Sequence, residues 1–103
     1  MTEAVVTLPS KEQFTEYLDS MFVARLEDGQ NFNLQLFRLD SSISNKMQES
    51  FSLLFRAPLD TPPFQNTFHI EQEKLGKMDL FLVPVEKKED CIVFEAVFNR
   101  LLV

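Results

Sequence analysis

Apolar and polar positions alternate with a period of two through much of the chain after residue 22. The alternation runs over residues 22–27, 32–36, 50–56 and 67–71. A period of two places successive side chains on opposite faces of a strand, with one face buried and the other in water. Each of these segments therefore predicts a half-buried β-strand.

Two later segments, residues 78–85 and 91–99, are apolar on both faces over much of their length. A sheet that buries only one face does not need this pattern, so we expect a helix or a subunit interface to cover the second face. Pro84 has no backbone N–H to donate and should lie at an edge or a bulge. The charged residues 87–90 should form an exposed connection.

Before the strands, the apolar positions follow a helical period. Ser10 and Gln13 have the S-x-x-Q spacing of a capping box, in which each side chain satisfies a free backbone N–H at the start of a helix. Apolar residues then recur at i, i+3, i+4 and i+7: Phe14, Tyr17, Leu18 and Met21. This spacing predicts an amphipathic helix over residues 10–21, preceded by an N-terminal arm or short strand over residues 1–9.

The two glycines of the chain predict two hairpin turns. A two-residue turn at Asp28 and Gly29 would pair apolar with amide side chains, whereas a three-residue loop over 27–29 pairs apolar with apolar. The longer loop also places Gly29 at the left-handed position that this class of hairpin requires. The same loop class fits residues 74–76. The expected pairs are Ala24 with Phe32, Phe22 with Leu34, Ile70 with Leu80, and Phe68 with Leu82.

Two segments lack a strand pattern and are predicted as loops. Residues 40–49 are polar, and residues 58–66 contain Pro58, Pro62 and Pro63, which cannot extend a ladder. With 103 residues, the chain is long enough for one core, and we expect a single domain over 1–103. Its antiparallel β part would span residues 22–99, followed by a C-terminal tail over 100–103.

The predicted fold class is mostly β (α+β). We expect a small antiparallel barrel or strongly curved sheet of about six strands with one N-terminal amphipathic helix, because closure leaves no long edge exposed. The interior should be filled with phenylalanine, of which the chain has 11. The helix would plug one end or lie against an outer apolar patch. A two-layer sheet with the helix on one face is the alternative.

Charge and composition exclude several classes of partner. The net charge of −6 opposes both nucleic-acid phosphates and anionic membranes, so neither is expected to bind. The first residues lack the pattern of a secretory signal, and a single cysteine allows no intramolecular disulfide. These features predict a cytoplasmic protein. No cofactor is expected, and a metal site would have to use carboxylates alone because the chain has one histidine.

Candidate chemistry is sparse. His69, the natural proton shuttle, falls on the polar face of its strand, where an exposed structural histidine is expected. Cys91 has no base near it in the sequence, so it is expected to be a small buried residue rather than a nucleophile. We therefore predict no catalytic residue and no enzyme activity. An active site would require a partner chain to complete it.

Four residues are candidates for contact with a partner: Pro62, Pro63, Phe64 and Arg56. The two prolines preorganise the backbone around Phe64, which makes an exposed aromatic there an economical contact. The competing and favoured interpretation is that Phe64 folds back as a lid on the core. Arg56 could hold a partner carboxylate through two hydrogen bonds, but a structural use, such as a buried ion pair that caps the sheet, is favoured.

The sequence resembles a family of uncharacterised bacterial domains of about this length. The resemblance is carried by LPSKEQFTEYLDSMF, FSLLFRAP, LGKMDLFLVPV and FEAVFNR, and it covers nearly the whole chain from Leu8. It implies no assigned activity and no catalytic residues. Members near genes for phage-tail-like collar proteins imply a structural or assembly role. The family pattern carries glycine where this chain has Ala57 and Asn66, so the turns around the proline loop should differ here.

The leading functional hypothesis is a non-enzymatic protein-interaction or assembly module that binds a protein partner or forms a homo-oligomer. Its expected contact surfaces are residues 58–64 and the last two strands. The alternative is a carrier that holds a small apolar ligand inside a Phe-lined barrel.

Overall fold

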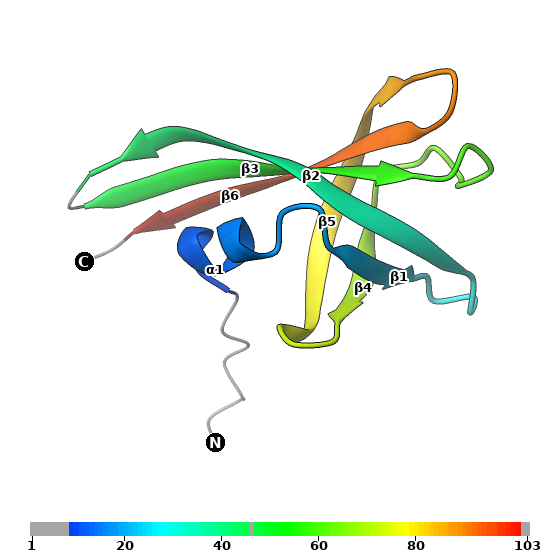
Figure 1. Ribbon diagram of the computed structural model, residues 1–103, viewed down its shortest axis with the longest axis horizontal. Coiled ribbons are helices and arrows are strands. Elements are labelled where there is room, and N and C mark those ends of the chain that lie inside the picture. The colour runs from blue at the N-terminus through cyan, green and yellow to red at the C-terminus, as the bar shows by residue number, and fades with distance from the viewer. Residues whose placement is uncertain (1–8, 46, 102–103) are drawn as a thin grey trace.

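The computed structural model describes residues 9–45 and 47–101 and shows a mostly antiparallel β structure with one short helix near the N-terminus (Figure 1). The strands close into a barrel in the order β1-β2-β3-β6-β5-β4, in agreement with the predicted fold class. The elements are α1 (Lys11–Glu16), β1 (Met21–Arg25), β2 (Asn31–Ser44), β3 (Gln48–Ala57), β4 (Asn66–Gln72), β5 (Gly76–Lys87) and β6 (Ile92–Leu101). No described helix is long and apolar enough to cross a membrane.

The hairpin between β1 and β2 has the register that the sequence predicts. Ala24 pairs with Phe32, and Phe22 pairs with Leu34. Leu26 donates its backbone N–H to the Gln30 carbonyl at 2.9 Å, which closes the predicted three-residue loop. Gly29, the last residue of that loop, has a φ of +93°, a conformation that costs a residue with a Cβ free energy. Polarity matching and glycine chemistry therefore selected the same turn.

The predicted register of the hairpin between β4 and β5 is wrong by two residues. Ile70 pairs with Met78 and Phe68 with Leu80, while Gly76 pairs with Gln72 instead of completing the loop. A shift of two residues leaves every side chain on the same face, so the alternation could not detect it. The turn determines the register, because the Gln72 side-chain oxygen accepts hydrogen bonds from the backbone N–H groups of Lys74 and Leu75.

Residues 40–49, predicted as a loop, are largely strand. β2 continues to Ser44 and β3 begins at Gln48, so the connection is only residues 45–47. The Asn45 side-chain oxygen accepts from the backbone N–H groups of Met47 and Gln48, which fixes this tight turn. Register shifts in the ladder lie between Leu36 and Arg38 and between Ser41 and Ile43, and they interrupt the alternation on which the prediction relied.

The helix is shorter than predicted. Ser10 and Gln13 form the predicted capping box, but α1 ends at Glu16, and Asp19 adopts a φ of +70° after it. The Asp19 N–H donates to the Leu36 carbonyl, and the Leu36 N–H donates to the Ser20 carbonyl. These bonds tie the segment after the helix to β2, so Met21 begins a strand and is 55% exposed instead of lying on the apolar face of a helix.

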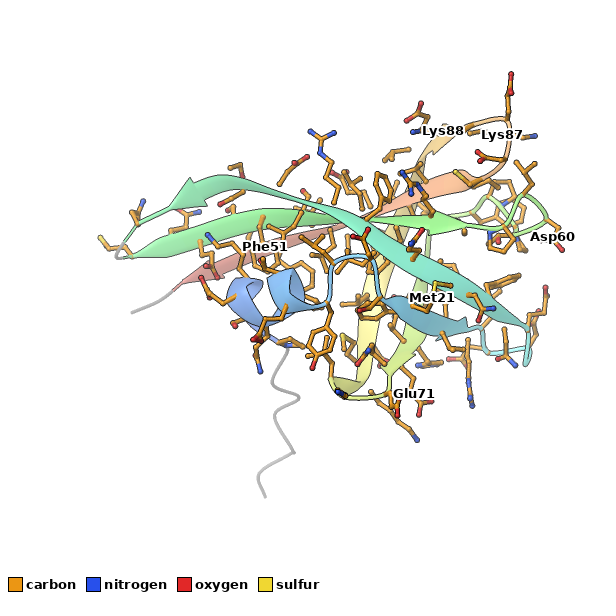
Figure 2. All side chains as sticks on the ribbon, viewed as in Figure 1. Met21, Phe51, Asp60, Glu71, Lys87 and Lys88 are labelled. Carbon is orange, nitrogen blue, oxygen red and sulfur yellow. The ribbon has the colours of Figure 1, made fainter. Side chains whose placement is uncertain are left out.

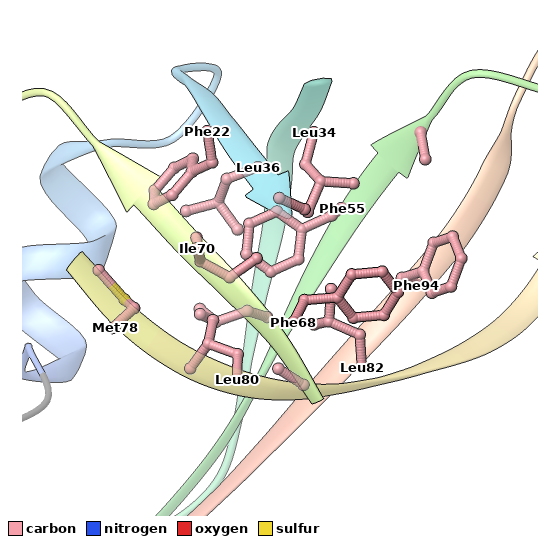
Figure 3. Packing of buried hydrophobic residues seen from close by; sticks show 14 of the residues in the cluster. Phe22, Leu34, Leu36, Phe55, Phe68, Ile70, Met78, Leu80, Leu82 and Phe94 are labelled. Atoms are coloured by element: carbon pink, nitrogen blue, oxygen red, sulfur yellow. The ribbon is translucent and has the colours of Figure 1, made fainter. Parts of the chain in front are cut away.

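Phenylalanine fills the interior, as predicted (Figure 3). Phe22 meets Phe55 edge to face at 5.5 Å between ring centroids, and Phe68 meets Phe94 in the same way at 5.9 Å. The helix contributes Phe14, which is fully buried. Its ring packs against a stacked pair at distances of 6.2 and 5.5 Å; the pair is Phe51 and Phe98. Figure 2 shows Phe51 beside α1, so the helix covers the inner face of the barrel at this end.

The last two strands extend beyond their predicted limits. β5 runs from Gly76 to Lys87, and β6 runs to Leu101, so the predicted tail over 100–103 begins as strand. The register between β5 and β6 shifts between Pro84 and Glu86, which places the proline at a bulge as predicted. The predicted arm over residues 1–9 lies outside the described residues except for Pro9, and residues 102–103 also lie outside them.

Candidate interaction surfaces

The loop of residues 58–65 holds three of the four predicted contact residues. The Thr61 N–H donates to the Pro58 carbonyl at 3.0 Å, and the Phe64 N–H donates to the Pro62 carbonyl at 2.9 Å. Phe64 is 68% exposed, so it does not fold back over the core as the favoured interpretation held. Buried Thr61 takes the inward position instead, and the aromatic ring is left at the surface. Whether this loop contacts a partner stays a prediction.

Arg56, the fourth predicted contact residue, lies on β3 just before that loop. It makes no ion pair with any described residue, which contradicts the expected buried ion pair. The guanidinium carbon lies 4.2 Å from the ring centroid of Phe37, and the Lys88 ammonium lies 5.9 Å from the same centroid. A cation over an aromatic face is held by the ring quadrupole. The Arg56 side chain therefore packs on Phe37 of β2.

A second surface forms where β5 and β6 separate. Their ladder runs only from Lys87 paired with Ile92 to Val83 paired with Glu95. Beyond that point β5 pairs with β4 and β6 pairs with β3, and the two strands diverge (Figure 1). A hollow of about 450 Å³ lies between them. The residues that line it belong to both strands: Asp79, Leu80, Phe81, Val83, Glu95, Ala96, Val97, Phe98 and Asn99.

The outer side of this hollow is apolar and exposed. Phe81 is 54% exposed and Val97 62%, whereas Leu80 and Ala96 on the inner side are buried. Val85, further along β5, is also exposed. The sequence correctly indicated strands that are apolar on both faces. The expected cover by the helix is wrong, because α1 packs on the inner face through Phe14. Cover by another subunit stays a prediction.

Two carboxylates stand beside these apolar side chains. The Asp79 carboxylate accepts a hydrogen bond from Nδ1 of His69 at 2.7 Å. Glu95 is half-buried, and its side chain makes no hydrogen bond or ion pair with any other described residue. The sequence analysis did not single out Glu95, because a lone acidic residue in an apolar strand carries no motif. Its place at the hollow follows from the end of the ladder between β5 and β6, where Glu95 pairs with Val83.

His69 lies on the polar face of β4, as predicted, with about half of its side chain exposed. It faces two carboxylates, Asp79 on β5 and Glu27 in the first hairpin loop, the latter at 3.5 Å from Nε2. The hydrogen bond and charge of Asp79, with a smaller effect of Glu27, raise the pKa of His69 above its ordinary value of 6.5. A histidine held between two exposed carboxylates forms a charged surface cluster.

Cys91 is buried, as predicted, with 8% of its surface exposed. Burial is the main cause that raises the pKa of its thiol, and the nearby Asp90 carboxylate raises it further. The thiolate is the nucleophilic form, so this environment disfavours reactivity. Among the described residues, no group of three or more His, Cys, Asp or Glu side chains is arranged to hold a metal ion.

Comparison with known proteins gives one match. The model of a family described as Domain of unknown function (DUF6916) matches residues 9–98, which include α1 and the barrel up to Phe98. No curated protein and no solved structure matches the chain. Because the matched segment covers far more than half of the sequence, the chain belongs to the DUF6916 family of domains of unknown function.

Proposed function

We propose that this domain is a non-enzymatic protein-interaction or assembly module that binds a protein partner through the outer side of β5 and β6. The observation that carries the proposal is the pair of exposed apolar side chains that line the hollow where the two strands separate, Phe81 and Val97, with exposed Val85 further along β5. Apolar side chains grouped around a concavity are typical of contact sites, whereas scattered ones are ordinary. The aromatic ring of Phe81 is the type of side chain that dominates binding energy.

The proline loop supplies a second, smaller surface. Phe64 and Leu59 are both exposed on it. Figure 2 places Asp60 of this loop toward the same end of the molecule as Lys87 and Lys88. The loop does not line the hollow, so we assign the main contact to β5 and β6 and treat the loop as an auxiliary surface.

An assembly role agrees with the phage-tail-like structural role that the resemblance stated above implies. We accordingly propose a cytoplasmic protein partner, in keeping with the single cysteine. The net charge of −6 favours a partner of opposite charge over another copy of the domain, because like charges oppose association.

Cross-linking mass spectrometry in the native cell tests this proposal. A photo-crosslinking residue at Lys77, beside the hollow, should yield one dominant cross-linked protein. The double variant F81S/V97S should lose most of that product, while the matched loop variant F64S should retain it. Equal yields from all three proteins, or no product above background, would contradict the assigned surface. Light scattering on the purified chain should show a monomer; a concentration-dependent dimer would identify the partner as another copy.

The hollow also supports a form of the second candidate, a carrier of a small apolar ligand, with the ligand between β5 and β6 instead of inside the Phe-lined barrel. Its volume of about 450 Å³ falls within the range of small-molecule pockets. Native mass spectrometry of protein purified from its own cell, without detergent, should then show a bound mass that the V97K variant lacks. A spectrum of unliganded protein alone would leave the interaction module as the better account.

A further inference from the structure

The hollow is bordered by a strand edge as well as by side chains. β5 from Lys77 to Leu82 pairs with β4 along one edge. Its other edge faces the hollow, because β6 pairs with β5 only from Val83 onward. Among the described residues, no backbone hydrogen bond from a turn or loop reaches this edge. The exposed edge spans about 20 Å at the rise of an extended chain, and such an edge is a template for a further strand.

We infer, building on the proposed function, that the partner contributes an extended peptide segment that adds to this edge of β5 as a strand and lies in the hollow between β5 and β6. Strand addition uses the backbone for affinity and alternate side chains for specificity. Here one face of the added strand would meet the buried floor, made by Leu80 and Ala96. The other face would lie between Phe81 and Val97 at the surface.

The charges around the hollow define the chemistry of that segment. Glu95 stands at the point where the two strands separate and has no cationic neighbour among the described residues within ion-pair distance. Asp79 lines the same hollow, although His69 already compensates part of its charge. A segment that fits alternates apolar residues with at least one Lys or Arg. A second copy fits poorly, because each copy carries a net charge of −6.

Selection from a displayed library of random twelve-residue peptides, with the full-length protein as bait, tests the inference. The enriched peptides should alternate apolar with polar residues and contain Lys or Arg. Synthetic versions should bind at least tenfold more weakly to V97K, which places a cation at the mouth of the hollow. They should bind about threefold more weakly to E95Q at low salt. The matched control F64S, on the proline loop, should bind as wild type does.

Backbone pairing needs its own readout. N-methylation of alternate peptide amides, on the edge that faces β5, should weaken binding at least tenfold, whereas methylation of the intervening amides should not. Amide chemical shifts should change most over Lys77–Leu82 of β5. Equal binding of both methylated series, peptides without a strand pattern, or no enriched peptide would overturn the inference. So would slow exchange, in the free protein, of the alternate β5 amides that do not donate to β4, since another segment or copy would then already occupy the edge.

The outcomes separate this inference from the proposed function. Cross-links lost in F81S/V97S, together with a failed peptide selection, would keep the interaction module and reject strand addition. Cross-links that persist in that variant would reject the proposed surface itself, whatever the library yields.

Discussion

The two edges of β6 differ in a way that organises the molecule. Along one edge, β6 pairs with β3 without interruption from Ile92 to Leu101. Along the other, it pairs with β5 only from Ile92 to Glu95. The first edge belongs to a fully bonded sheet, while the second leaves the barrel wall open, and Phe14 of α1 packs from inside on Phe98, which lines the opening. The difference shows that one strand can be bonded to a neighbour along its whole length on one side and along less than half of it on the other.

The largest loss of stability is expected in the packing between β3 and β6, the edge that is paired along its whole length. Phe51 on β3 is 1% exposed and stacks on Phe98 of β6 with ring centroids 4.7 Å apart. Phe51→Ala should lower the free energy of unfolding by about 3 to 5 kcal/mol, because it removes a large buried side chain and leaves a cavity. Urea titration followed by circular dichroism measures this loss.

Val97→Ala is the matched control, since Val97 lies next to Phe98 on β6 but points outward and is 62% exposed. It should change the free energy of unfolding by less than about 0.5 kcal/mol. Comparable losses of stability in the two variants would refute the view that the inward side chains of β6 stabilise the fold while its outward side chains do not.

A somewhat smaller effect is expected where α1 covers the open side. Phe14→Ala should cost about 3 kcal/mol and should free the helix from the barrel, because Phe14 is the one buried residue of α1. Hydrogen exchange should accelerate in α1 and in the part of β6 beyond Glu95, with less change over Ile92–Glu95. Leu18→Ala, at a position 37% exposed, is the control and should leave exchange nearly unchanged. Uniform acceleration of exchange over the barrel would show that α1 does not specifically stabilise the part of β6 beyond Glu95.

An opposite effect is expected in the loop after β3. The Thr61 hydroxyl oxygen is buried without a hydrogen-bond partner in the described part of the chain. A buried unsatisfied polar group costs about 1 to 3 kcal/mol, so the nearly isosteric Thr61→Val should raise the free energy of unfolding by about 1 kcal/mol. Thermal unfolding should show a higher midpoint. A lower midpoint would mean that the hydroxyl is satisfied, for example by an ordered water.

The two hairpins show how far the sequence could predict this fold. At Gly29, a one-residue change of register would have exchanged the faces, so polarity alone decided and the prediction was confirmed. At Gly76, the competing registers differed by two residues and kept the same faces, so polarity was uninformative. The deciding bonds come from the Gln72 side chain, and no periodic pattern reports them.

The candidate site was predictable only in part. The apolar outer faces of β5 and β6 follow from their sequences. Phe64 was named as a candidate contact, but the favoured interpretation, a lid folded back on the core, was wrong. The hollow was not predictable, because it depends on where a ladder between two long strands ends. That end is set by twist and by the bulge at Pro84, which are properties of the assembled barrel.

The smallest expected effect is a change in the pKa of His69, which depends on a carboxylate that lines the hollow. Asp79 lines the hollow and raises the pKa of His69, so Asp79→Asn should lower that pKa toward 6.5, with a smaller decrease for Glu27→Gln. A histidine whose pKa is raised on folding stabilises the native state below about pH 6.5, and this contribution is lost as pH rises through the folded pKa. Wild type should therefore exceed Asp79→Asn in stability most near pH 6 and least near pH 8. Titration of the His69 ring protons by NMR measures the pKa directly. A basic peptide bound in the hollow should also lower this pKa, because its cation competes with the imidazolium for Asp79; an unchanged titration in the complex would place the cation elsewhere.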